Sequence, residues 1–148
     1  MGGWTLSDLR EQVNSVMRAA LPVELQGVIK SVEKKSDGGF YDQTLKTTND
    51  LLWVPSDREL NCENISYVVA NQGEPYALFT DSMSRKKYDF KENTVIYWTR
   101  STGTNGQHYG RYIDSQGNPG SMGAAGYAAI NLGFCIILRA LKTLLQKG

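Results

Sequence analysis

The chain has 148 residues, 41% of them hydrophobic, and its 16 basic and 15 acidic residues give a formal net charge of +1. This length is typical of one domain that buries enough apolar surface to fold without disulfides or metals. A charge so near zero argues against a nucleic-acid-binding protein and against attraction to an anionic membrane. The longest apolar run, residues 134–138, is too short to span a bilayer, so we expect no membrane insertion.

The first apolar residues recur at spacings of three and four, which predicts a helix over residues 6–20. Thr5 and Asp8 have the spacing of a capping box, and Pro22 ends the helix. Charged residues interrupt this segment, so it does not have the pattern of a signal peptide. The predicted apolar face consists of Leu6, Leu9, Val13, Val16, Met17 and Ala20.

A short helix is expected at residues 23–28 and a strand at 29–34. Asp37-Gly38-Gly39 marks a turn, and the polar stretch 41–50 predicts a loop. The apolar residues 51–54 predict a buried strand.

Pro55 stops that strand, and residues 56–59 predict a capped helical turn. Periodicity is weak over residues 65–93, which predicts mostly loop with short helical or extended pieces.

A glycine-rich hairpin joins the next two predicted strands, residues 94–99 and 108–114. A turn follows at 115–119, and residues 128–130 and 134–138 predict the last strands. Helices first and strands last predict an α+β fold.

A C-terminal tail, residues 139–148, is expected to form a short amphipathic helix beyond a domain of residues 1–138. The apolar stripe of this expected helix favours self-association, so we also expect a homo-oligomer. The stripe consists of Leu138, Leu141, Leu144 and Leu145.

The two cysteines, Cys62 and Cys135, lack the CxxC spacing of zinc or thioredoxin-like sites. Cys135 lies in an apolar stretch, which favours a buried free thiol. A disulfide between the two is the alternative, and only the distance between them decides it.

The tract 103–133 is rich in glycine and carries only two formal charges, Arg111 and Asp114. Such a segment predicts short strands and ordered loops that present a surface, because glycine permits unusual backbone angles and tyrosine offers contact area. The tract therefore favours binding over catalysis.

Five groups of residues, in this order, resemble a bacterial and phage family of C-type-lectin-like domains of unknown function. They are Gly2-Gly3-Trp4 with Ser7-Asp8-Leu9-Arg10; Leu21-Pro22 with Val28-Ile29-Lys30; Asp50-Leu51-Leu52-Trp53 with Ser56 and Glu59; Tyr97-Trp98-Thr99-Arg100-Ser101; and Gly133-Phe134-Cys135-Ile136. The sequence departs from the family pattern at Tyr97, Thr99, Thr102 and Leu132.

The resemblance implies a C-type-lectin-like fold, in which N-terminal helices pack on a small twisted antiparallel sheet with long irregular loops. The variable proteins of diversity-generating retroelements are related in fold and display a ligand-binding face on phage tails or bacterial surfaces. Their diversified tracts lack Lys, Glu, Gln, Met and Trp, and residues 101–131 contain only Gln107, Gln116 and Met122 from that set. Any loop rich in glycine, serine and asparagine would have a similar composition.

Catalysis is not expected. His108 is the single histidine, lies in a glycine-rich hairpin and has no acidic neighbour in sequence, so a surface contact is its predicted role. Formylglycine-generating enzymes, which are related in fold, use paired cysteines that this chain lacks. Glu74-Pro75 lacks the asparagine of a calcium-binding lectin motif, so we expect calcium-independent recognition with no metal and no cofactor.

The predicted ligand-binding residues are Thr102, Asn105, His108, Tyr109, Arg111, Asn118 and Tyr127. Strand alternation places Tyr109, Arg111 and Ile113 on one face and Tyr112 on the other. Tyrosine and arginine contribute most to interface energy, but a merely polar outer sheet surface is the alternative.

Four further side chains have two interpretations each. Trp4, Trp53 and Trp98 are core residues or sugar-stacking platforms, with packing favoured. Arg100 either supports a loop carbonyl or carboxylate or contacts a ligand.

The sequence thus predicts a non-enzymatic recognition domain on a phage virion or bacterial cell surface. Its partner would be a cell-surface protein or carbohydrate. The alternative is a structural or assembly module of such a particle or surface complex.

Overall fold

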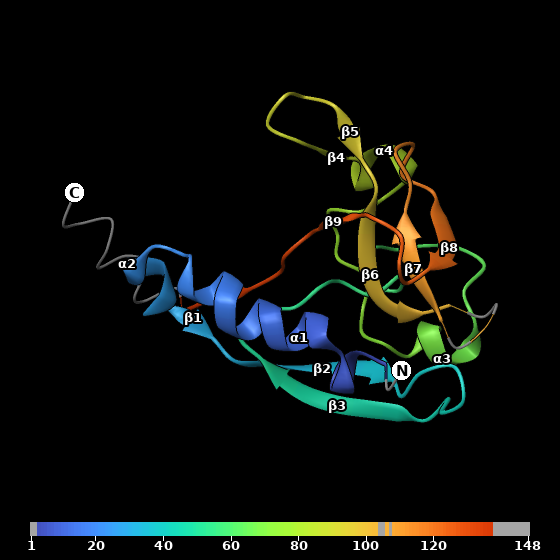
Figure 1. Cartoon of the computed structure of the whole chain (residues 1–148), viewed down its shortest axis with the longest axis horizontal. Helices are drawn as coiled ribbons and strands as arrows, with labels where there is room; N and C mark the ends of the chain where they lie inside the picture. Colours follow the sequence, from blue (N-terminus) through green and yellow to red (C-terminus); the bar gives the residue numbers. More distant parts are fainter. Residues whose placement is uncertain (1–2, 104–105, 107, 138–148) are drawn as a thin grey trace.

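The computed structural model describes residues 3–103, 106 and 108–137, and combines short helices with small β-sheets (Figure 1). The helices are η1 (Trp4–Leu6), α1 (Asp8–Gln12), η2 (Val13–Met17), α2 (Val23–Gln26), α3 (Tyr67–Ala70) and α4 (Ser82–Arg85). The strands are β1 (Ile29–Lys30), β2 (Val32–Asp37), β3 (Leu45–Asp50), β4 (Lys87–Tyr88), β5 (Thr94–Val95), β6 (Tyr97–Thr102), β7 (Tyr109–Ile113), β8 (Pro119–Gly123), β9 (Ala129–Ile130) and β10 (Cys135–Ile136). The predicted α+β class is confirmed, and the helix expected at 139–148 lies outside the described residues.

The N-terminal helix is capped by Ser7, whose Oγ accepts a hydrogen bond from the Arg10 N–H at 3.1 Å, and not by Thr5 as predicted. α1 continues into η2, a π-helical segment with more residues per turn than an α-helix. The predicted apolar face is wrong in part: Leu6, which lies in η1 before the Ser7 cap, is 77% exposed, and Val16, which lies in η2, is 69% exposed. The face toward the core consists of Leu9, Val13 and Met17.

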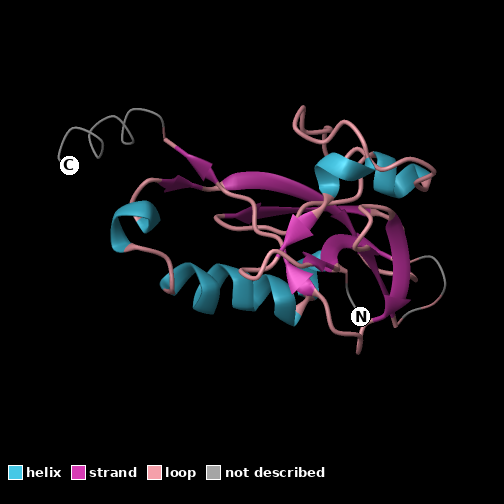
Figure 2. Cartoon of the chain, turned by 90° about the horizontal axis from the view of Figure 1, so that it is seen from above, coloured by secondary structure: helices cyan, strands magenta, loops and turns pink. Residues whose placement is uncertain are grey.

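The polar stretch 41–50 is not wholly a loop, because β3 (Leu45–Asp50) pairs with β2 along its whole length. Asp37 lies opposite Leu45 and Val32 opposite Asp50, so six residues of each strand form an antiparallel ribbon (Figure 2). The buried side chains of β3 are Thr48 and Asp50. Because they are polar, they produce no alternating apolar pattern, and partner pairing overrides weak propensity here.

The largest sheet has the strand order β8-β7-β6-β9. β6 and β7 form the predicted antiparallel hairpin, whereas β9 pairs with β6 in parallel. β8 was not predicted: the expected turn at 115–119 overlaps only its first residue, and Pro119-Gly120-Ser121-Met122-Gly123 has low β propensity. β1 pairs with β10, so segments near both ends of the domain meet.

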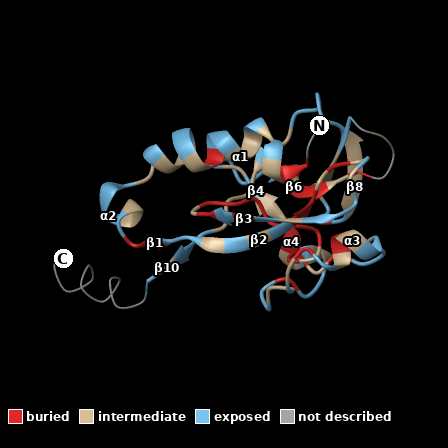
Figure 3. Ribbon diagram, turned by 90° about the horizontal axis from the view of Figure 1, so that it is seen from below, coloured by how far each residue is buried: buried red, intermediate tan, exposed pale blue. Residues whose placement is uncertain are grey.

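Two clusters of buried residues form the core. Figure 3 colours all buried residues red, and most of them lie between the N-terminal helix and the segments around α3 and α4. One lies under the N-terminal helix and contains Trp4, Val13, Ile29, Leu52, Trp53 and Val54. The other lies under the large sheet and contains Leu60, Cys62, Phe79, Tyr97 and Ile113. Residues 51–54 are largely buried as predicted, but the strand reduces to one bridge between Trp53 and Gly133.

Both cysteines are free, so no disulfide joins Cys62 to Cys135. Cys62 is buried, which raises the pKa of its thiol to about 12. The prediction of a buried Cys135 is wrong: this side chain is exposed in β10, opposite Lys30. β10 is only two residues long, and its two side chains are exposed and half-buried, so Cys135 faces outward although its neighbours in sequence are apolar.

Candidate functional site

Arg100 lies at the centre of a buried polar network behind β6. An irregularity between Trp98 and Thr102 turns the intervening residues inward, so that the Arg100 side chain is fully buried. Its guanidinium donates to the carbonyls of Lys35 at 3.1 Å, Val54 at 3.0 Å and Gln72 at 2.6 Å, and forms an ion pair with Glu59. Of the two interpretations of Arg100, support of loop carbonyls and a carboxylate is confirmed.

Glu59 connects this arginine to the predicted capped turn at residues 56–59, which the structure confirms. Ser56 Oγ accepts from the Glu59 N–H at 3.1 Å, and Glu59 Oε2 accepts from the Ser56 N–H at 3.1 Å. Lys34 Nζ lies 2.8 Å from Glu59 Oε1 and 3.9 Å from the Trp53 ring centroid. Burial alone would raise the pKa of Glu59, but the Arg100 and Lys34 contacts outweigh it and lower that pKa.

A second part of the network fixes the end of β6 through Asp37. Thr102 Oγ1 donates to Asp37 Oδ1 at 2.7 Å, and Gln72 Nε2 donates to Asp37 Oδ2 at 2.5 Å. Ser101 Oγ in turn donates to Gln72 Oε1 at 2.6 Å. Thr102 is therefore held in place, with its side chain only half-buried.

Arg111 faces the interior of the protein. Its Nε lies 2.7 Å from Asp57 Oδ2, and Thr99 Oγ1 donates to Asp57 Oδ1 at 2.6 Å. Burial raises the pKa of Asp57, and the Arg111 charge opposes that rise. Since Ile113 on the same face of β7 is fully buried, this face is the inner one.

The opposite face of the sheet carries aromatic rings that lie over glycines. A Cβ added to Gly110 would lie 2.9 Å from Trp98 Cζ3, so the six-membered ring of the indole occupies the space of a missing side chain. A Cβ added to Gly120 would lie 2.6 Å from Tyr112 Cζ. Trp98 and Tyr112 are cross-strand partners and half-buried.

A groove of about 650 Å³ separates this outer face from the start of the N-terminal helix. Trp98 and Gly110 contribute from the outer face of the sheet, Thr102 and Tyr109 from the end of β6 and the start of β7, and Asp8 and Leu9 from α1. Ala124 and Ala128, from the loop between β8 and β9, line it as well. That loop is tied to the start of β7, because the Ala124 N–H donates to the His108 carbonyl at 2.7 Å. Both size and lining are typical of a binding site for a small ligand.

The structure brings some of the predicted binding residues together at this groove. Thr102 and Tyr109 line it, and Tyr109 is 41% exposed. His108 is exposed beside Tyr109, and Tyr127, 99% exposed, lies between the two groove-lining alanines in sequence. Asn105 lies outside the described residues.

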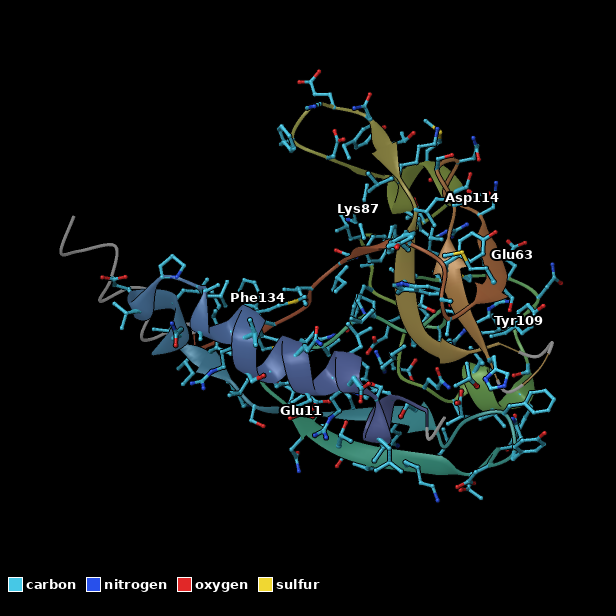
Figure 4. The ribbon with its side chains drawn as sticks, viewed as in Figure 1. Glu11, Glu63, Lys87, Tyr109, Asp114 and Phe134 are labelled. Atoms are coloured by element: carbon cyan, nitrogen blue, oxygen red, sulfur yellow. The ribbon has the colours of Figure 1, made fainter. Side chains whose placement is uncertain are left out.

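Asn118 does not belong to this group. It lies in the β7–β8 turn, where its N–H donates to Asp114 Oδ1 at 2.8 Å. Figure 4 shows Tyr109 and Asp114 at opposite ends of β7. Five strand residues span roughly 15 Å, so one small ligand does not contact both ends.

Two of the three tryptophans are core residues, as favoured from the sequence. Trp4 Nε1 donates to Asp50 Oδ2 at 3.0 Å and Trp53 Nε1 donates to the Tyr76 hydroxyl at 3.1 Å, with both rings buried. Trp4 and Trp98 both line the groove, but Trp98 differs because it is only half-buried. The sequence signal that could have revealed it is Gly110, a strand glycine that marks a close approach.

The groove has few charged side chains in its lining. Within residues 3–103, 106 and 108–137, no group of three His, Cys, Asp or Glu side chains is placed to hold a metal ion. The charged residues that line the groove are Asp8 and Arg100, and the guanidinium of Arg100 is already engaged. None of the helices in the described part is long and apolar enough to cross a membrane.

Comparison with known proteins gives a family but no characterised relative. No curated protein matches the chain, and no solved structure matches it. One family model matches residues 2–137, which is most of the chain. The protein therefore belongs to the DUF6273 family, a domain of unknown function.

Proposed function

We propose that this protein is a non-enzymatic recognition domain that binds its ligand in the groove between the outer sheet face and the start of α1. One observation carries the proposal: a preformed groove of about 650 Å³ is lined by aromatic side chains, backed by a rigid polar network, and contains Thr102 and Tyr109. Rigid scaffolds that position exposed loop residues are typical of binding proteins. The ligand would be a cell-surface protein or glycan, with the domain on a phage particle or bacterial surface.

The C-type-lectin-like fold is part of this proposal. An N-terminal helix packed near small, mostly antiparallel sheets and long irregular loops supports it. The family's sequence landmarks provide further support, since Asp50, Glu59 and Arg100 all hold loops through buried contacts. The β-sheet architecture is more divided than the resemblance implies, with two-stranded ribbons beside the larger sheet.

Diversification of residues 101–131 would vary the groove directly. This tract supplies Thr102, Tyr109, Ala124 and Ala128 to the lining. A second, untranslated copy of its coding sequence beside a reverse transcriptase gene would support diversification. An intact locus without such a copy would contradict it.

The test of recognition is binding of the oligomerised domain to whole bacterial cells. Tyr109→Ala and Tyr127→Ala are expected to weaken binding, because Tyr109 lines the groove and Tyr127 is exposed in the loop that supplies Ala124 and Ala128 to it. Tyr88→Ala is the matched control, since Tyr88 is an exposed tyrosine in the separate β4–β5 hairpin. Binding that both groove variants leave unchanged would refute the proposal.

An assembly module is the second candidate, favoured by exposed apolar side chains around the β4–β5 hairpin. Phe90 at the hairpin tip is 91% exposed, and Leu78, Met83 and Tyr88 are also exposed. Such a patch marks a protein contact in many proteins. Self-association that Phe90→Ser abolishes would favour this candidate, and a monomer at all concentrations would count against a homo-oligomer. Deletion of residues 139–148 tests the other predicted oligomer contact.

A further inference from the structure

We propose that the groove binds a neutral oligosaccharide, with Trp98 as the surface on which a sugar ring stacks and Asp8 as an acceptor for its hydroxyl groups. This inference rests on the proposed function, since it names the ligand class of the same groove. It is carried by the placement of one aromatic ring and one carboxylate on opposite walls.

The indole of Trp98 is held firmly enough to act as a stacking surface. Its six-membered ring lies over Gly110, where an added Cβ would approach Cζ3 to 2.9 Å and Cε3 to 3.2 Å. The backbone of β7 therefore supports the ring on one side, while the rest of the half-buried side chain lines the groove. A sugar ring has an apolar C–H face that matches such an aromatic surface, and the contact costs little side-chain entropy.

Asp8 supplies the polar half of the site. It lies in the first turn of α1, is exposed, and has no hydrogen bond or ion pair within the described residues. Its carboxylate accepts several hydrogen bonds, which suits the adjacent hydroxyl groups of a sugar. In contrast, the Ser7 and Thr102 hydroxyls that line the groove already donate to the Trp4 carbonyl and to Asp37.

Charge and ring arrangement argue against other small ligands. An anion would meet Asp8, while the Arg100 guanidinium is occupied by Glu59 and three carbonyls. A quaternary ammonium needs several rings around one point. Of the aromatic residues that line the groove, Trp4 is buried with its Nε1 bonded to Asp50, and Phe40 packs edge-on against Tyr41, so these two rings are already engaged within the protein.

The experiment is a screen of the full chain against an array of neutral oligosaccharides, followed by titration of the bound sugars. Tryptophan fluorescence reports binding, and the Trp98→Ala variant separates the Trp98 signal from that of Trp4, which also lines the groove. Trp98→Ala is expected to weaken binding at least about tenfold, the scale of one lost stacking contact. Asp8→Ala is expected to weaken it by about three- to tenfold, as for loss of a hydrogen-bond acceptor.

Two glycine substitutions form a matched pair that keeps every groove side chain. Gly110→Ala places a methyl group against the Trp98 indole and is expected to weaken sugar binding. At Gly123 an added Cβ meets nothing within 4 Å, so Gly123→Ala is expected to bind as the parent protein does. Equal binding by the two variants would overturn the role of Trp98.

The outcomes separate this inference from the proposed function. No binding to any neutral oligosaccharide by the folded protein overturns the inference. The inference is also overturned if protease treatment of the cells abolishes cell binding and added sugars do not compete with it. If Tyr109→Ala weakens that binding, the groove remains a protein-binding site. Cell binding that neither Tyr109→Ala nor Trp98→Ala affects overturns the inference and the proposed function together.

Discussion

The two faces of β6 show how one strand serves two purposes. Arg100 and Thr99 point inward to carboxylates and carbonyls that hold distant loops, whereas Trp98 points outward over Gly110 into the groove. The charged Arg100 is thus buried and structural, whereas the aromatic Trp98 is accessible. This is the reverse of the usual pattern, in which charged residues are exposed and aromatic residues are buried. The comparison teaches that in this domain polar contacts build the frame and apolar rings meet the ligand.

The largest expected effect is on the inner face. Arg100→Ala leaves the Glu59 carboxylate buried without its main cation, so we expect the free energy of unfolding to fall by about 3–5 kcal/mol. Urea denaturation followed by circular dichroism measures the change. Lys30→Ala serves as the control, because the Lys30 side chain is exposed and forms no ion pair within the described residues. Similar losses in the two variants would show that the network does not stabilise the fold.

The outer face should respond less to a change in packing. Gly110→Ala crowds the Trp98 indole, and we expect a loss of about 1 kcal/mol with a shifted tryptophan emission. Gly123→Ala should change the unfolding free energy by less than about 0.5 kcal/mol. Identical emission spectra for both variants would mean that Trp98 does not rest on Gly110.

The inner network also gives a pH dependence. Because the folded-state pKa of Glu59 is lowered from 4.5, its contribution to stability is present above pH 4.5 and is lost as the pH falls through the folded-state pKa. Asp57 acts in the opposite direction, since its pKa is raised. Unfolding midpoints of the parent and Glu59→Gln should therefore converge as the pH is lowered from roughly 6 to 3. Parallel curves would contradict the lowered pKa of Glu59.

The smallest stability effect is expected in the loop between β8 and β9. Tyr127→Ala removes a side chain that is 99% exposed, so the unfolding free energy should change by less than about 0.5 kcal/mol. Thermal denaturation checks this, and ligand binding is measured on the same sample. A large destabilisation would place Tyr127 in a packing role and remove it from the proposed site.

Much of the local structure was predictable because it rests on short-range chemistry. The buried segment 51–54, the turn at 56–59 and the β6–β7 hairpin all follow from apolar runs, capping residues and glycines near each other in sequence. β3 and β8 were missed because their residues have weak strand propensity and depend on neighbours for pairing. The apolar helix face shifted because π-helical hydrogen bonding changed the angular spacing.

Some of the proposed binding residues could be identified from the sequence, and others only from the structure. The sequence identified Thr102, His108, Tyr109 and Tyr127, which lie in or next to the glycine-rich tract, by residue type alone. It could not decide which face of β7 was inner, since Arg111 and Tyr112 are equally plausible outward residues until Asp57 is placed beside one of them. It also could not separate Trp98 from the buried tryptophans, or Asn118 from the group around Tyr109.

The sequence by itself determined an α+β domain of near-neutral charge with a glycine-rich tract suited to presenting a surface. The tertiary structure alone decided that Arg100, Glu59 and Asp37 are internal supports, and that Asp8 and Trp98 share a groove although 90 positions separate them. The physical reason is that periodicity and capping act over a few residues. Ion pairs, ring-on-glycine contacts and grooves depend on which distant segments pack together.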